Sequence, residues 1–168
     1  MSNAYQTTIH IHPAAVKWLD AHFVKVDDAY DVRTQPIYVL IQSGLARKNI
    51  KIPQKKSVKL KKNIPVKFLV NEWDFYHFGW TIPNATQEKI SKYLYKTMLM
   101  QFCRDIASAY VYGGFPIDVV VRRILIEYLF DDNELSYYNL RKFYSRNYNE
   151  KEKELFEFKR IMSYSMTQ

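Results

Sequence analysis

Residues 84–109 read "NATQEKISKYLYKTMLMQFCRDIASA". The hydrophobic period of the chain changes where this stretch begins, so the stretch opens the second of two different halves. Its apolar residues recur at intervals of three and four, which is the pattern of one buried face of an α-helix. The stripe consists of Ile90, Leu94, Met98, Phe102, Ile106 and Ala109. Such a stripe fills about five to six helical turns, and Gly113-Gly114 predicts where the helix ends.

The sequence predicts three more helices after this one. Pro116 suits the first turn of the second helix, whose apolar stripe extends from Ile117 to Tyr128. The acidic run "DDNE" (131–134) interrupts the period, and residues 135–148 resume it as a third helix. We expect a fourth helix from Glu150 to about Tyr164, with charges spaced for pairing on its exposed face.

The half before residue 84 is predicted to be mainly strand. In "YQTTIHIHP" (5–13) apolar and polar residues alternate until Pro13, and a short helix is expected from about Ala14 to Phe23. The run "PIYVLIQ" (36–42) is continuously apolar and has strand length, so we expect a strand buried on both faces. Between residues 50 and 70 apolar residues alternate with lysines, which predicts neighbouring antiparallel strands with a lysine-bearing outer face.

Together these patterns predict an α+β fold, with an N-terminal antiparallel sheet and a short helix packed against a C-terminal lobe of three to four helices. Residues 1–83 would form a mainly β lobe with lysine-rich strands, and residues 84–168 would form a helical lobe. With 168 residues, 48% of them hydrophobic, the chain is long enough for one compact domain with a real core.

The positive charge of the chain is concentrated in one segment. The formal net charge is +8, and residues 32–71 contain ten basic residues and no Asp or Glu. Because the whole chain has 25 basic and 17 acidic residues, the remainder is slightly acidic. Lysines are hydrated point charges that attract phosphate without fixed geometry, so the segment indicates a nucleic-acid partner, DNA or RNA. The residues expected to contact phosphate are Lys48, Lys51, Lys55, Lys56, Lys59, Lys61, Lys62 and Lys67.

The function expected from this charge is non-enzymatic nucleic-acid binding, through phosphate contacts with weak sequence preference. Arg141, Lys142 and Arg146 would extend the surface if the two lobes align. The alternative is a protein–protein assembly or adaptor module whose basic face docks an acidic partner. A third interpretation is a solvated face whose lysines protect exposed strand edges.

The stretch "WDFYHFGW" (73–80) directly follows the lysine-rich strands and contains five aromatic rings in eight residues. We expect these rings to fill the junction between the sheet and the helices, because large rings dominate protein cores. The alternative is a set of exposed rings on which the bases of a single-stranded nucleic acid stack.

The stretch "YYNLRKFYSRNY" (137–148) raises the alternative of a helix-turn-helix, with Arg141 and Arg146 reaching base edges or phosphates and Asn139 reading adenine. The acidic connection before it and the lack of a glycine in that connection argue against the motif. A packed helical lobe is the favoured interpretation.

No catalytic, metal or cofactor signature emerges from the sequence, so we expect neither an enzyme nor a cofactor. His10 and His12 share one face of a strand without a third ligand at supporting spacing, and we interpret them as surface imidazoles. The chain contains no Walker loop and no GxGxxG pattern. A single cysteine, Cys103, and the lack of a signal peptide or apolar membrane span predict a cytoplasmic protein without a membrane partner. Homo-oligomerisation stays open.

Overall fold

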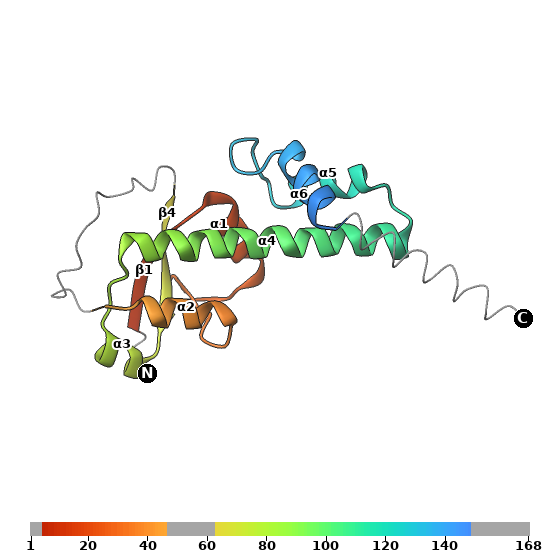
Figure 1. Cartoon of the computed structure of the whole chain (residues 1–168). Coiled ribbons are helices and arrows are strands. Elements are labelled where there is room, and N and C mark those ends of the chain that lie inside the picture. Colours follow the sequence, from red (N-terminus) through yellow and green to blue (C-terminus); the bar gives the residue numbers. More distant parts are fainter. Residues whose placement is uncertain (1–4, 47–62, 149–168) are drawn as a thin grey trace, which may run out of the picture. The chain divides into compact units, whose positions relative to one another are not determined.

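The computed structural model describes residues 5–46 and 63–148 (Figure 1). In chain order the elements are β1 (Tyr5–Ile11), α1 (Pro13–His22), β2 (Lys25–Val26), β3 (Ala29–Tyr30), α2 (Pro36–Gly44), β4 (Ile64–Val70), α3 (Glu72–Phe78), α4 (Asn84–Gly113), α5 (Ile117–Glu127) and α6 (Tyr137–Asn147). A sheet with short helices is therefore followed by a helical region, and the predicted α+β class is confirmed. The strands expected at residues 50–61 and the helix expected from residue 150 lie outside the described residues.

The Cα atoms cluster into two compact units, Met1–Lys96 and Thr97–Gln168, which meet within α4. The predicted lobe boundary at residues 83 and 84 lies at the start of α4. As a domain boundary it stays a prediction.

The sheet of the first unit has four strands in the order β1-β4-β3-β2. β1 runs antiparallel to β4, with Tyr5 opposite Val70 and Ile11 opposite Ile64. β3 pairs in parallel with β4 through Tyr30 and Phe68, so the sheet is mixed and not purely antiparallel as expected. Parallel neighbours need a crossover connection, and α2 lies within the connection from β3 to β4.

Residues 36–42 form most of α2, and the strand predicted there is wrong. Pro36 occupies the first turn, where its fixed φ favours a helix. Ile37, Tyr38 and Ile41 are buried while Val39 is 63% exposed, which is a helical pattern of burial. A short run that is apolar throughout carries no period of its own, so sequence cannot distinguish a buried strand from a helix.

β1 is an edge strand of the sheet, and side chains of α4 form hydrogen bonds to the backbone of its free edge. The backbone N–H of His10 donates to Gln87 Oε1 at 3.0 Å, and the N–H of His12 donates to Ser91 Oγ at 3.0 Å. Gln87 and Ser91 are themselves buried, at 7% and 4% exposure. Unpaired backbone donors are costly to bury, and these two side chains satisfy them.

The core of the first unit lies between the sheet and its helices. α1 buries Ala14, Ala15, Trp18 and Leu19, and its last turn is linked to β3 by the Tyr30 hydroxyl, which donates to Asp20 Oδ1 at 2.7 Å. The hydrophobic strand residues of this core are Ile9, Ile11, Ala29, Tyr30, Val66, Phe68, Leu69 and Val70. Their burial is the main favourable contribution to folding of this unit.

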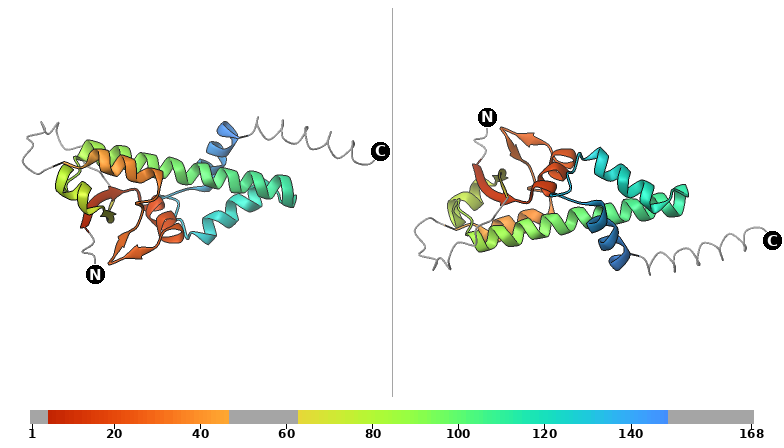
Figure 2. Two further views of the ribbon diagram at one scale, coloured as in Figure 1. Left: turned by 90° about the horizontal axis from the view of Figure 1, so that it is seen from below. Right: turned by 90° about the horizontal axis from the view of Figure 1, so that it is seen from above.

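The second unit consists of the C-terminal part of α4 with α5 and α6 (Figure 2). Gly114 adopts φ +65° directly after α4, which confirms the predicted helix stop. The chain then turns back, and the ring of Tyr128 after α5 lies 4.9 Å from the ring of Phe102 on α4. The fully or nearly buried side chains here are Met98, Leu99, Phe102, Cys103, Ile106, Val120, Val121, Ile124, Leu135, Leu140 and Tyr144.

Candidate nucleic-acid interface

Most of the lysines predicted to contact phosphate belong to residues 47–62, outside the described part of the chain. They are Lys48, Lys51, Lys55, Lys56, Lys59, Lys61 and Lys62. Lys67 is described, and it extends from the exposed side of β4 with its Nζ 3.6 Å from Asp28 Oδ2. Both side chains of this pair are well exposed, so Lys67 keeps access to solvent.

Arg141, Lys142 and Arg146 lie on α6 in the second unit, apart in the chain from Lys67 of the first. Arg141 Nε is 3.1 Å from Asp118 Oδ1, and the Tyr137 hydroxyl donates to the same oxygen at 2.6 Å. These bonds, the one from Tyr137 foremost, lower the pKa of the Asp118 carboxyl. Arg141 therefore links α6 to α5, while Lys142 and Arg146 are exposed.

The connection between α5 and α6 does not have the form expected of a helix-turn-helix. α5 ends at Glu127 and α6 begins at Tyr137, which leaves nine residues between them. The motif joins its two helices by a turn of about three or four residues. The longer connection favours the packed helical lobe over that alternative.

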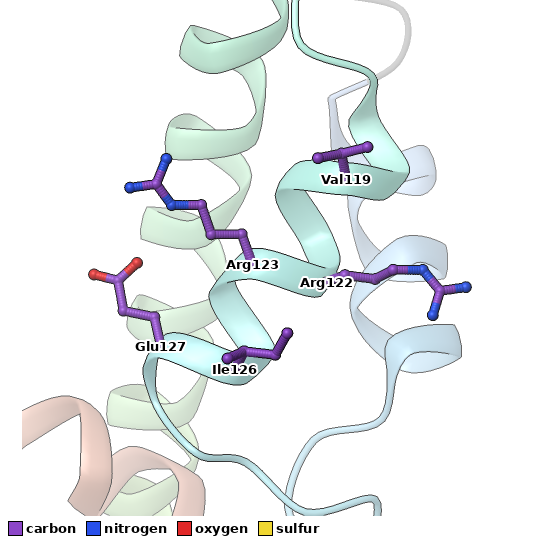
Figure 3. Close-up of a pocket in the computed structure, with 5 residues that line it drawn as sticks. All are labelled: Val119, Arg122, Arg123, Ile126 and Glu127. Carbon is purple, nitrogen blue, oxygen red and sulfur yellow. The ribbon is translucent and has the colours of Figure 1, made fainter.

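A shallow hollow of about 560 Å³ lies on the outer surface of α5 (Figure 3). Its lining consists of Val119, Arg122, Arg123, Ile126 and Glu127. Figure 3 shows the two arginines pointing to opposite sides of the helix. The sequence prediction missed both of them, although their place beside the apolar stripe of α5 could have indicated an exposed basic position.

The rings of residues 73–80 are mostly exposed, so the prediction that they fill a core is wrong. Trp73 is 58% exposed, Tyr76 56%, Phe78 41% and Trp80 45%. These four residues form what we call the α3 aromatic surface. Of the five rings in this stretch only Phe75 is half-buried. The short helix α3 follows β4 directly and lies at the end of the sheet where β1 begins (Figure 1).

Contacts among the rings hold the α3 aromatic surface in place. The Trp73 and His77 rings stack with centroids 4.0 Å apart and an interplanar angle of 18°, and His77 Nδ1 bonds the Trp73 carbonyl oxygen at 2.8 Å. Tyr5 from β1 shares a hydroxyl–hydroxyl hydrogen bond of 2.8 Å with Tyr76. This bond, together with partial desolvation, raises the pKa of Tyr5 to about 12. Phe75 stacks against Trp80 at 5.6 Å.

A buried carboxylate anchors α3 to α2. Asp74 is 2% exposed, and its oxygens accept hydrogen bonds from the Tyr38 hydroxyl at 2.6 Å and from Gln42 Nε2 at 2.7 Å. Burial, and then the bond to Asp74, raise the pKa of Tyr38 to about 12. The backbone N–H of Asn71, which precedes α3, donates to the Tyr38 hydroxyl at 2.8 Å. The base of the α3 aromatic surface is therefore fixed by polar contacts on its buried side.

The residue that precedes the lysine-rich segment (residues 47–62) is bonded to the chain just after the α3 aromatic surface. Ala46, the last described residue before it, pairs with Thr81 in an antiparallel bridge. The Ala46 N–H donates to the Thr81 carbonyl at 2.8 Å, and the Thr81 hydroxyl donates to the Ala46 carbonyl at 2.7 Å. Thr81 is the neighbour of Trp80 in the chain, so the described chain reaches Ala46 close to the backbone of that residue.

The histidines of the first half have structural partners. His10 Nδ1 lies 2.9 Å from Gln87 Oε1, and His12 Nδ1 accepts from the N–H of Ala14 at the start of α1. Both are half-buried, so the interpretation as surface imidazoles is wrong for this pair. Across residues 5–46 and 63–148, no three His, Cys, Asp or Glu side chains are placed to hold a metal ion. Over the same ranges no helix is both long and apolar enough to cross a bilayer.

Comparison with known proteins gives no match, whether the chain is compared with protein-family models, with curated proteins or with solved structures.

Proposed function

We propose that this protein binds nucleic acid without catalysing a reaction, through contacts that are mainly to phosphate and show weak sequence preference. The observation that carries the proposal is the ten basic residues between positions 32 and 71, which no acidic residue accompanies. A segment of this composition attracts a polyanion by releasing its counterions.

Local pairing of acidic residues elsewhere in the chain supports the proposal. Among the described residues, five of them lie in ion pairs with nearby basic side chains, namely Asp20–Lys25, Asp28–Lys67, Asp31–Arg33, Glu88–Lys92 and Asp118–Arg141. Charges paired in this way contribute little to the long-range field of the protein. Two of these pairs use Arg33 and Lys67, so the proposal rests on the other eight basic residues of the 32–71 stretch, which lie between positions 47 and 62.

The test is fluorescence anisotropy of labelled single- and double-stranded DNA and RNA at about 50 and about 200 mM salt, where counterion release is large. A variant with Lys56, Lys59 and Lys61 changed to Glu should lose most of its affinity. The matched control changes Lys89, Lys96 and Arg104 on α4 to Glu, and all three are exposed. Each triple substitution lowers the formal net charge from +8 to +2, so only the position of the lost charge differs.

Binding that weakens steeply with salt and is lost only in the first variant supports the proposal. Equal losses in the two variants would show that net charge alone attracts the ligand. No binding to any of the four nucleic acids at the lower salt concentration would refute the proposal.

The second candidate is an assembly or adaptor module that docks an acidic protein. The surface of α5 favours it, because Val119 and Ile126 are 54% and 72% exposed beside Arg122 and Arg123. An apolar stripe flanked by arginines suits a partner helix with acidic edges. Substitution of Arg122 and Arg123 by Glu would abolish that docking and would leave nucleic-acid binding by the lysine-rich segment intact.

A further inference from the structure

The α3 aromatic surface is unusual because large rings that could be buried instead face solvent. Trp73, Tyr76, Phe78 and Trp80 are each at least 41% exposed, and all four lie within eight residues. Single exposed apolar residues are common on protein surfaces, but a contiguous group of this kind usually marks a binding site. The question is which ligand the group fits.

Contacts with neighbouring side chains restrict the orientations of the exposed rings. His77 covers one face of Trp73 at 4.0 Å, and the edge contact between Trp73 and Phe78, with planes at 76°, fixes the Trp73 ring further. Tyr76 is held through its hydroxyl by Tyr5. Rings that are ordered before binding lose little entropy when a flat ligand stacks on them.

The charged residues near the α3 aromatic surface are two carboxylates on α3 itself and, in the sequence, the basic residues that follow Ala46. Asp74, the acidic residue in the middle of α3, is buried against Tyr38, and Glu72 accepts a hydrogen bond from the Tyr5 hydroxyl at 3.3 Å. The basic segment begins directly after Ala46, which is bonded to Thr81 next to Trp80. A purely apolar partner would carry no negative charge for the basic residues after Ala46 in the sequence to attract.

We propose that the α3 aromatic surface stacks the bases of single-stranded nucleic acid, and this inference rests on the proposed nucleic-acid-binding function. Every base offers a π-face, so stacking on Trp73 and Trp80 tolerates any sequence. In a duplex the bases are already stacked on one another and their faces are covered. The surface therefore selects single strands, whereas the lysines attract single and double strands alike.

Tryptophan fluorescence of the full chain provides a direct test, because Trp18 is 4% exposed while Trp73 and Trp80 lie on the proposed surface. An oligothymidylate of about 12 nucleotides, within the usual range of site sizes, should quench the emission. Inorganic polyphosphate carries the charge without the bases, and it should bind without quenching. A matched DNA duplex should likewise quench little.

Substitutions at Trp73 separate stacking from general apolar contact. Trp73→Leu keeps an apolar side chain but removes the π-face, and it should weaken oligothymidylate binding about 5- to 150-fold, the equivalent of one stacked base. Trp73→Phe keeps a ring and should lose much less. The control is Tyr112→Leu at the end of α4, where the ring is 72% exposed in the second unit. Circular dichroism checks that each variant is folded.

The outcomes distinguish this inference from the proposed function. If the oligothymidylate binds but does not quench, or if Trp73→Leu binds as well as wild type, base stacking is refuted and phosphate binding stands. If Leu and Phe at position 73 behave alike, the surface makes apolar contacts without stacking, which also refutes the inference. If neither polyphosphate nor any nucleic acid binds, the proposed function itself fails.

Discussion

The hydroxyl of Tyr38 on α2 donates a hydrogen bond of 2.6 Å to the buried carboxylate of Asp74 on α3. The same hydroxyl accepts the backbone N–H of Asn71 at 2.8 Å. One oxygen atom thus joins two helices and the turn between β4 and α3. The position of the exposed rings depends on this buried contact, because Asp74 follows Trp73 directly.

Tyr38→Phe should destabilise the protein by about 1.5–3 kcal/mol, since hydrogen bonds to charged groups contribute this much and a buried carboxylate loses a donor. Urea unfolding followed by circular dichroism measures the change. We also expect altered tryptophan emission, because α3 loses an anchor. A control is Tyr93→Phe on α4, where the side chain is 40% exposed, and it should be nearly neutral. An unchanged unfolding midpoint in Tyr38→Phe would contradict the anchoring role.

Gly79→Ala should cost about 1–3 kcal/mol, because Gly79 ends α3 at φ 111° and ψ −165°, a region open essentially only to glycine. Gly114, at φ +65°, is in the left-handed region that Asn tolerates. Asn should therefore substitute for Gly114 with little loss and for Gly79 with a large one. Thermal unfolding of the two Asn variants makes the comparison, and equal losses would show that the Gly79 conformation imposes no special restriction.

Gly44→Ala should destabilise wild type because the new Cβ would lie 2.7 Å from Thr86 Cγ2. Threonine is β-branched and stiff, so this methyl group cannot easily move aside. Thr86→Ser removes the methyl group, and in that background Gly44→Ala should become stabilising by about 0.5–1 kcal/mol through helix propensity. The four free energies of unfolding form a double-mutant cycle. Additive effects would show that the two positions do not interact.

Asp118 should make the second unit sensitive to acid. Its lowered pKa means that the folded state favours the carboxylate, so its contribution is fully present above the ordinary aspartate pKa of about 3.9. That contribution is lost as the pH falls through the lowered value. The difference in Tm between wild type and Asp118→Asn should accordingly be present near pH 6 and shrink below about pH 3. A difference that is independent of pH would contradict this assignment.

Much of the fold could be predicted because its signals are local. The apolar stripe from Ile90 to Ala109 indicates α4, and Gly114 ends it at the expected place. The alternation from Tyr5 to Ile11 indicates β1. These signals succeed because a helix and a half-buried strand impose different periods on the sequence.

The failures concern information that is not local. The apolar run at 36–42 has no hydrophobic period of its own. Its helical form depends on how it packs against the rest of the first unit. The exposure of Trp73 and Trp80 could not be read from composition, since an aromatic ring suits a core and a binding surface equally well. The contact of Gln87 with His10 joins residues 77 positions apart, and no pattern in the sequence indicates it.

The side chains of Gln87 and Ser91 have a consequence for how copies of the chain meet. A sheet can pair with another chain where an edge strand exposes a row of unsatisfied backbone groups. On the outer side of β1, side chains of α4 already satisfy the N–H groups of His10 and His12. At the opposite side, β2 spans two residues, Lys25 and Val26, and is too short to template a partner strand. At these positions the described sheet edges offer little backbone for another strand to pair with.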